Sequence, residues 1–166
     1  KNLGPSGLAL VIIRKDMLEK SCRETIDLLD YRKQAAQGSR LNTPPVFGVY
    51  CMGLVFDWIA AQGGLIGIAE RNTAKAKVIY DAIDGSGGFY RGHAQMDSRS
   101  EMNVTFRLPN EDLEKTFVSE AKSHDMDGLK GHRSVGGIRA SIYNAFPIEG
   151  CQALAGFMSD FATKNG

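Results

Sequence analysis

The spacing of apolar residues in the second half of the chain, first every two positions and then every four, constrains its fold more than any other feature. Apolar residues first recur at every second position, as on the inner face of a strand: Met102, Val104, Phe106 and Leu108. They then recur at every fourth position, as on a helix that Asn110 would cap: Leu113, Phe117 and Ala121. One or two strands follow, with an inward face formed by Ile138, Ala140 and Ile142. A last helix is expected after Pro147, with an inward stripe of Cys151, Leu154, Ala155, Met158 and Phe161. This order predicts a small, mainly antiparallel sheet covered by helices on one face.

The first half of the chain has a different pattern. The continuous branched apolar run Leu8–Ile13 predicts a strand covered on both faces. Residues 30–41 are polar and irregular. Asn42 and Thr43 are expected to cap a helix whose first turn holds Pro44 and Pro45. This helix should run to about residue 62, and because it is apolar nearly all around, we expect it between layers or against another subunit.

Gly63 and Gly64 are expected to end that helix and to mark a boundary. A half-exposed amphipathic helix is predicted over residues 65–83, with one stripe formed by Ile68, Asn72, Ala76, Ile79 and Ile83. The predicted fold class is α/β. Residues 1–62 form the carboxyl-terminal part of a large layered domain, and residues 63–166 form a small α+β domain.

Composition narrows the classes of partner. The 166 residues carry a formal charge of +1 with acids and bases interspersed, so neither nucleic acid nor membrane is an expected partner. The expected partners are small molecules and other protein chains. The cysteines Cys22, Cys51 and Cys151 are far apart and indicate reduced thiols in a cytosol-like compartment. We assign no metal, because His93, Asp97 and His124 lack a metal-ligand spacing.

Lys1 stands directly before a turn that contains Gly4 and Pro5 and leads into the apolar run. A lysine at a chain start is most often a solvated residue. Held at the edge of a sheet, it could instead be desolvated enough to present the neutral amine that forms an imine. Asn42 and Thr43 could add anion binding to their capping role, because a helix start favours an anion.

His132, Arg133 and Arg139 form a third group of candidates around a glycine-rich turn. Singly, each is most simply a loop or surface residue. Together they suit a dianionic substrate, which needs several fixed donors, and arginine offers a planar fork to a carboxylate. Residues 85–88 are glycine-rich as well, but without the lysine and the strand-to-helix context of a phosphate loop they are expected to be a flexible connection.

Several segments resemble the phosphoserine aminotransferase family, a class V aminotransferase family of fold type I, and they do so in the family's order. These are residues 1–7 (KNLGPSG), 42–45 (NTPP), 99–106 (RSEMNVTF), 131–141 (GHRSVGGIRAS) and 143–147 (YNAFP). The resemblance covers essentially the whole chain. It implies that residues 1–62 are the tail of the large pyridoxal-phosphate-binding domain and that residues 63–166 are the small carboxyl-terminal domain.

The resemblance also implies roles for the candidate residues. Lys1 would bind pyridoxal 5′-phosphate as a Schiff base and act as the general base and acid. Asn42 and Thr43 would reach the cofactor phosphate of a neighbouring subunit, which implies a homodimer. Arg139 would hold the substrate α-carboxylate, while His132 and Arg133 would contact the phosphate of phosphoserine.

The implied reaction is transamination between O-phosphoserine with 2-oxoglutarate and 3-phosphohydroxypyruvate with glutamate, in serine biosynthesis and in the cytoplasm. The amino-terminal half of such an enzyme is expected to be missing here, so the chain alone is expected to be inactive, and whether it binds the cofactor is left open. Two alternatives stay open. One is a folded, non-catalytic domain that only binds anions or dimerises; the other is a class V aminotransferase whose substrate carries no phosphate.

Overall fold

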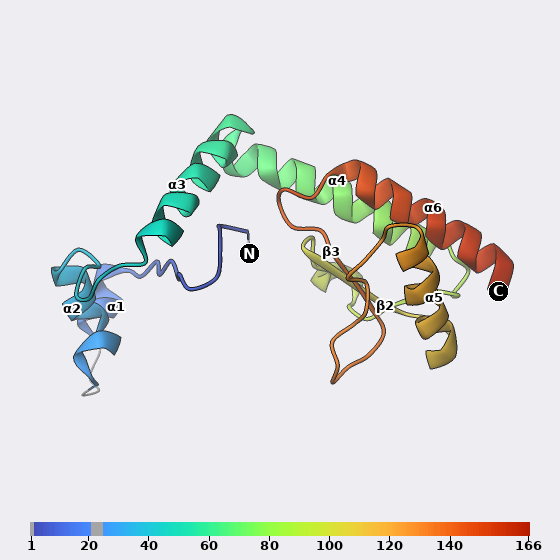
Figure 1. The fold of residues 1–166 in the computed structure, drawn as a ribbon, viewed down its shortest axis with the longest axis horizontal. Helices are drawn as coiled ribbons and strands as arrows, with labels where there is room; N and C mark the ends of the chain where they lie inside the picture. Colours follow the sequence, from blue (N-terminus) through green and yellow to red (C-terminus); the bar gives the residue numbers. More distant parts are fainter. Residues whose placement is uncertain (1, 21–24) are drawn as a thin grey trace. The chain divides into compact units, whose positions relative to one another are not determined.

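The computed structural model describes residues 2–20 and 25–166, and within them the chain forms two compact units. Unit 1 comprises the described residues of 3–59, and unit 2 comprises residues 60–166 together with Asn2 (Figure 1). The division falls three residues before the predicted boundary at 62/63, and the assignment of the two parts to a large and a small aminotransferase domain stays a prediction. The elements in chain order are α1 (Lys15–Glu19), η1 (Asp27–Leu29), α2 (Tyr31–Ala36), α3 (Val46–Ala61), α4 (Gly64–Asp84), β1 (Arg91–Gly92), η2 (Met96–Ser98), β2 (Asn103–Arg107), α5 (Glu111–Ser123), β3 (Ile138–Ser141) and α6 (Ile148–Asn165).

Unit 2 is built on a three-stranded antiparallel sheet in the order β1-β2-β3. Val104 pairs with Ala140 and Thr105 with Arg139, so side chains of equal parity on the two strands share a face. One face is buried and carries Val104, Phe106, Ile138 and Ala140. The opposite face carries the half-exposed residues Asn103, Thr105, Arg107, Arg139 and Ser141. The predicted alternation is confirmed on both strands, whereas the two-residue β1 is too short to have a period.

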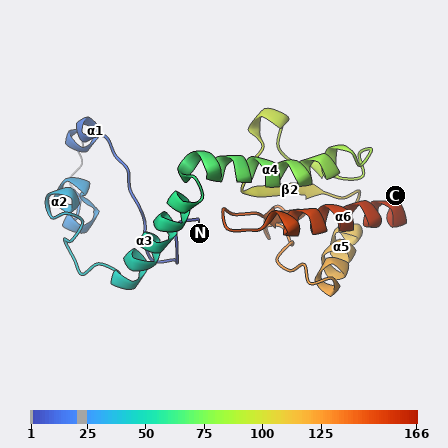
Figure 2. The ribbon, with the colours of Figure 1, turned by 90° about the horizontal axis from the view of Figure 1, so that it is seen from above.

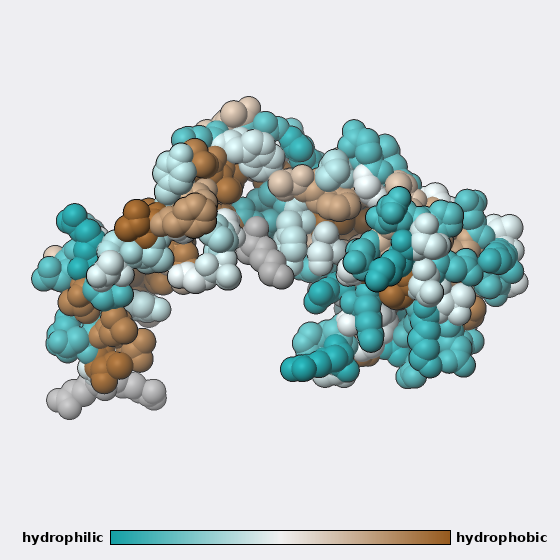
Figure 3. All heavy atoms as spheres, viewed as in Figure 1, coloured by the Kyte–Doolittle hydropathy of each residue, from teal (hydrophilic) through white to brown (hydrophobic). Residues whose placement is uncertain are grey.

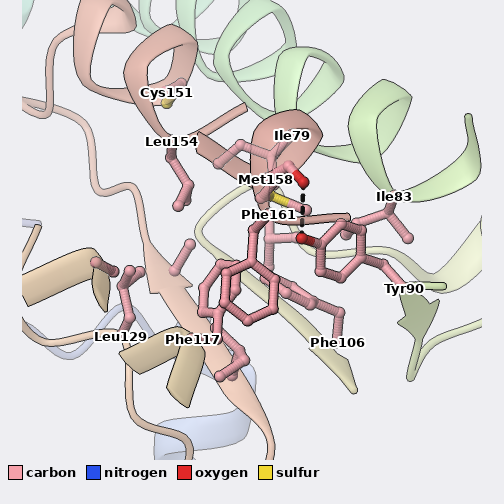
Figure 4. Packing of buried hydrophobic residues seen from close by; sticks show 14 of the residues in the cluster. Ile79, Ile83, Tyr90, Phe106, Phe117, Leu129, Cys151, Leu154, Met158 and Phe161 are labelled. Carbon is pink, nitrogen blue, oxygen red and sulfur yellow. Dashed lines mark hydrogen bonds between the residues drawn. The ribbon is translucent and has the colours of Figure 1, made fainter. Parts of the chain in front are cut away.

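Helices α4, α5 and α6 all cover the buried face of this sheet. Their inward side chains join those of the strands in one hydrophobic cluster, and α4 and α6 run side by side along it (Figures 1 and 2). Phe117 of α5 lies at the centre, with its ring edge-on to those of Phe106 at 5.8 Å and Phe161 at 5.1 Å. The Tyr90 hydroxyl donates to the Met158 carbonyl oxygen at 2.8 Å (Figure 4). The predicted α+β arrangement of this part is therefore confirmed.

The helix boundaries in unit 2 follow the predicted signals. The Asn110 side chain accepts from the Leu113 amide at 2.9 Å at the start of α5, and His124 is the cap residue directly after its end. Between α3 and α4, Gly63 and Gly64 take φ values of +88° and +67°, which favour glycine. The buried stripe of α4 contains the five predicted residues and one that the pattern did not indicate, Lys75.

The predicted strand at Leu8–Ile13 is wrong in this structure: the segment has no regular structure, and its apolar side chains after the half-buried Leu8 are exposed, Ile12 to 90%. A strand forms by pairing with a neighbour, and the described residues of unit 1 contain no other strand. Leu8 instead lies near Gly48 of α3, where an ideal Cβ would meet its side chain at 3.7 Å.

Helix α3 is apolar around its circumference, as expected, but it is not buried within this chain. Phe47 is 75% exposed, and the one buried residue of α3 is Gly48. Figure 3 shows brown, apolar surface along this helix. Residues 30–41 were predicted to be irregular, but they contain the helix α2. Asp30 caps this helix by accepting from the Arg32 amide at 2.9 Å. No single helix among the described residues is both long and apolar enough to cross a bilayer; α3 and α4 meet that measure only when taken together.

Candidate functional site

Residues 131–137, which we call the glycine loop, are the last part of the connection from α5 to β3 in unit 2. The loop is closed at its base, where the Gly131 amide donates to the Gly137 carbonyl at 2.8 Å and Lys130 bridges to Ile138. At its tip the Val135 and Gly136 amides donate to the His132 carbonyl at 2.9 and 2.7 Å. This narrow hairpin places His132 and Arg133 at its exposed end. The predicted glycine-rich turn is confirmed.

His132 is held in a defined orientation. The Ser134 amide lies 3.3 Å from the His132 Nδ1 atom and the Ser134 hydroxyl lies 2.7 Å from it. A backbone amide can only donate, so Nδ1 is the acceptor and the hydrogen of the neutral ring is on Nε2. The ring therefore presents an N–H donor away from its own loop, as binding to an anion requires.

Arg139 lies on β3, opposite Thr105 and on the sheet face away from the helices. Its Nε atom is buried and has no hydrogen-bond partner among the described residues. A buried donor without an acceptor is costly, and a ligand oxygen is one way to satisfy it. This is the feature of Arg139 that suits the carboxylate-binding role predicted for it.

Arg139 and His132 line one hollow of about 240 Å³ together with Arg107, His93 and Thr105. Among the described residues that line this Arg139 hollow there is no aspartate or glutamate, so its charge is positive. The volume of the hollow is slightly below the usual 300–1,000 Å³ of ligand pockets, and the hollow suits a small anionic molecule. The structure thus brings His132 and Arg139 together.

Arg133 faces a different space. It lines a groove of about 690 Å³ between the glycine loop and α5, and Lys115, Lys122 and Lys130 line the same groove. His132 borders this groove as well as the Arg139 hollow. The two residues predicted to share a phosphate therefore lie on one loop, but Arg133 does not line the hollow that contains Arg139.

Lys1 lies outside the described residues, as does Cys22, and their predicted roles stay predictions. The residue after Lys1 is anchored to unit 2: the Asn144 amide donates to the Asn2 Oδ1 atom at 3.0 Å, and the Asn2 amide group donates to the Met102 sulfur at 3.1 Å. Asn72 of α4 in turn donates to the Asn144 side chain at 2.9 Å. The turn after β3 thus fixes the position of Asn2.

Asn42 and Thr43 do not cap α3, so the capping prediction is wrong. The helix begins at Val46, and the Val49 amide donates to the Pro45 carbonyl at 3.0 Å. A residue that precedes a proline is disfavoured in the α conformation, which keeps both Thr43 and Pro44 out of the helix. The Asn42 side chain donates instead to the Thr43 carbonyl at 3.3 Å.

The part in cofactor binding predicted for Asn42 and Thr43 is supported only by the hydrogen-bond donors that their side chains carry. Asn42 and Thr43 are exposed in unit 1 and carry an amide and a hydroxyl, both of which can donate to a phosphate oxygen. They fit the phosphate of pyridoxal phosphate in this respect. No group of metal-ligating side chains occurs in the described part of the chain.

Two residues of this site were not predicted from the sequence, Arg107 and Glu114. Arg107 lies between the Arg139 hollow and the α5 groove, and Glu114 borders the groove. The strand pattern could have indicated Arg107, because it lies two residues after Thr105 and therefore on the same outward face. Spacing could have indicated the second, since Glu114 precedes the buried Phe117 by three residues.

Comparison with known proteins agrees with the resemblance. The family model for class V aminotransferases, "Aminotransferase class-V", matches residues 1–154. The phosphoserine aminotransferases of Herpetosiphon aurantiacus and Lysinibacillus sphaericus are 61% and 56% identical to this chain over 100% and 99% of its length. The chain spans 46% of the length of each of these relatives.

Solved structures give the same result. The phosphoserine aminotransferase from Bacillus circulans subsp. alkalophilus matches with a TM-score of 0.94 at 52% identity, over 100% of this chain and 46% of that one. A phosphoserine aminotransferase from Trichomonas vaginalis with bound pyridoxal phosphate matches with a TM-score of 0.82 at 39% identity, over 89% of this chain and 42% of that one. The predicted resemblance and fold class are confirmed, and this chain belongs to the class V aminotransferase family.

Proposed function

We propose that this chain is the substrate-binding part of a phosphoserine aminotransferase, and that the whole protein transfers an amino group between O-phosphoserine and 2-oxoglutarate. The observation that carries the proposal is the Arg139 hollow: a positive space without acids among its described lining residues, where a buried arginine Nε lacks a partner beside an oriented histidine. Both substrates are anions with an α-carboxylate, and O-phosphoserine adds a phosphate.

Arg139 would bind the α-carboxylate common to both substrates, because its guanidinium offers two parallel donors to two carboxylate oxygens. The strand fixes its backbone, so a bound carboxylate would be held at a constant position. The Nε2–H group of His132 would donate to the substrate phosphate, with Arg133 contributing from the other side of the glycine loop. Substrates without a phosphate would leave these two donors unused.

Pyridoxal phosphate, when bound, supplies the electron sink for the reaction. Lys1 would carry the proton to and from the substrate Cα. Asn42 and Thr43 would hold the cofactor phosphate of a neighbouring subunit. This arrangement requires a homodimer, and the activity belongs to serine biosynthesis in the cytoplasm.

The test uses the longer protein that includes the region preceding this chain in its relatives. Pyridoxal phosphate is added, the protein is reduced with borohydride, and peptides are mapped. We expect the label on the Lys1 side chain of the longer protein and none on this chain alone. An unlabelled Lys1 in a folded longer protein would contradict the proposal, and labelling of this chain alone would show that it holds a cofactor site without the preceding region.

A substrate without phosphate is the second candidate function, favoured by the separation of Arg133 from the Arg139 hollow. Substitutions His132→Ala and Arg133→Ala in the longer protein distinguish the two. If phosphoserine is the substrate, each should lower kcat/KM for phosphoserine by about tenfold or more and change that for glutamate much less, as for a lost charge-assisted bond. Equal losses for the two substrates would favour the second candidate.

A further inference from the structure

We propose that Glu114 and Arg107 form a brace that positions the glycine loop, and that this brace sets the preference for the phosphorylated substrate. The inference rests on the proposed function, because it concerns the loop that carries His132 and Arg133. Neither Glu114 nor Arg107 is proposed to touch the substrate phosphate. Both are positioning residues, and each acts through the backbone of the loop.

Glu114 connects three separate segments. It lies in the first turn of α5 and is 8% exposed. One carboxylate oxygen, Oε2, accepts from the Gly137 amide at 3.1 Å, at the carboxyl end of the glycine loop. The other, Oε1, lies 2.9 Å from the Arg107 Nε atom and also accepts a long bond from the Leu108 amide at 3.4 Å. A buried carboxylate with several donors is held firmly in place.

Arg107 extends the brace to the tip of the loop. Its Nε atom faces Glu114, and its Nη1 atom donates to the Val135 carbonyl at 2.6 Å. The same guanidinium therefore joins the base of α5 to the residue that follows Ser134. Because Nε and Nη1 are both engaged, Arg107 is fixed where it borders the Arg139 hollow.

The loop backbone is shaped to accept this brace. Gly136 and Gly137 have φ values of +75° and +72°. A Cβ at Gly136 would lie 2.8 Å from Arg107 Nη1, and one at Gly137 would lie 2.7 Å from Arg107 Cδ. The positive φ favours glycine at both positions, and a side chain there would in addition displace Arg107. The arginine and the two glycines thus fit one another, and they hold the residues that orient His132.

The consequence for specificity follows from where the brace acts. It holds the loop that bears His132 and Arg133, whereas Arg139 is fixed independently by the ladder between β2 and β3. Loss of the brace should therefore displace the phosphate donors and leave the carboxylate-binding arginine in place. A displacement of about 1 Å at a binding group can cost up to two orders of magnitude in rate.

The test uses the full-length holoenzyme and the variant Glu114→Gln. Glutamine keeps the size of the side chain, but its NH₂ group must face either the Gly137 amide or Arg107 Nε, which are both donors. We expect KM for O-phosphoserine to rise about tenfold and KM for glutamate to change less than about twofold. Arg107→Lys should give a smaller change, since one ammonium group cannot replace both Nε and Nη1 at their separate partners.

Asp84→Asn provides the matched control. Asp84 accepts two 2.7 Å bonds from Arg99 in the same unit, and among the described residues it makes no hydrogen bond or ion pair with the glycine loop. This variant should leave the ratio of the two KM values unchanged. If Glu114→Gln raises both KM values equally, or leaves the phosphoserine value unchanged, the proposal is overturned.

A second measurement separates the brace from the proposed function. Trypsin cleaves after exposed arginines, and Arg133 is exposed at the tip of the loop. Cleavage between Arg133 and Ser134 should be about tenfold faster in Glu114→Gln than in the wild type and unchanged in Asp84→Asn. If the wild type does not use phosphoserine but cleavage is still accelerated, the proposed function fails and the brace stands. Cleavage at equal rates in Glu114→Gln and wild type shows that no brace holds the loop.

Discussion

Lys75 of α4 is 2% exposed, and its ammonium group donates to the carbonyls of Ile142, Tyr143 and Asn144 at 3.1, 2.6 and 3.4 Å. These carbonyls belong to the turn that follows β3 and holds Asn2 through the Asn144 amide. The lysine therefore supplies a hydrogen-bond donor to three carbonyl groups of this turn. At the scale of single residues, it joins α4 to the end of the sheet together with the bond from Asn72 to Asn144.

Substitution Lys75→Met tests this role. Methionine retains much of the apolar stem but leaves the buried carbonyls without a donor, which should lower the free energy of unfolding by about 2–3 kcal/mol. The matched control is Lys77→Met, since Lys77 pairs with Asp81 on the exposed face of the same helix. It should cost less than about 1 kcal/mol. Denaturant unfolding measures both, and equal losses would contradict the role given to Lys75.

The same residue predicts a dependence on pH. Burial lowers the pKa of Lys75 from its ordinary value of 10.5. Between that lowered value and 10.5 the unfolded chain binds more protons than the folded one, so this group makes stability rise with pH across the window. The stability of the wild type minus that of Lys75→Met should increase through this window and level off above it. A difference that does not change with pH would show that the charged form is not disfavoured.

At the scale of elements, the two predicted caps had different outcomes. Asn110 accepts from the Leu113 amide, whereas Asn42 accepts no helix amide among the described contacts. Their sequence contexts explain this, because no proline separates Asn110 from α5, while Pro44 and Pro45 separate Asn42 from α3. A cap signal is reliable only when the helix can begin directly after it.

Substitution Asn110→Ala should lower the free energy of unfolding by about 1 kcal/mol, because the Leu113 amide loses its acceptor. Asn42→Ala is the control and should change stability by less than about 0.5 kcal/mol in protein without cofactor, as for an exposed substitution away from such features. Chemical denaturation of the two variants measures the difference. Equal effects would mean that Asn42 also caps a helix in solution.

At the scale of the whole molecule, the two units differ in how they bury apolar side chains. Unit 2 has a hydrophobic core of strands and helices. In unit 1 the run Leu8–Ile13 and the helix α3 expose large apolar side chains, among them Ile12, Val46 and Phe47. Such surface promotes association. The relatives that match this chain are about twice its length, as the 46% coverage shows.

We therefore expect this chain alone to associate with itself and the longer protein to form a defined dimer. Size-exclusion chromatography with light scattering measures both. Phe47→Asp should reduce the association of the chain alone, because it places a charge on the exposed face of α3, and Asp57→Asn on the same helix should not reduce it. A chain that is monomeric at all concentrations would show that these side chains are covered within it.

The sequence by itself determined the α-helices of unit 2, its strands β2 and β3, and the family, but not the short elements β1 and η2. Periods of two and of nearly four residues, an unobstructed cap at Asn110 and glycines at the turns are local signals, and each predicted its element because the partners of that element lie within this chain. The tertiary structure decided the rest. Leu8–Ile13 has the composition of a strand but no described strand beside it, and the inward charges of Lys75 and Glu114 acquire meaning only from backbone groups distant in sequence. His132 and Arg139 share a hollow that Arg133 does not line, and this likewise depends on how the glycine loop folds at the end of β3, which no local pattern determines.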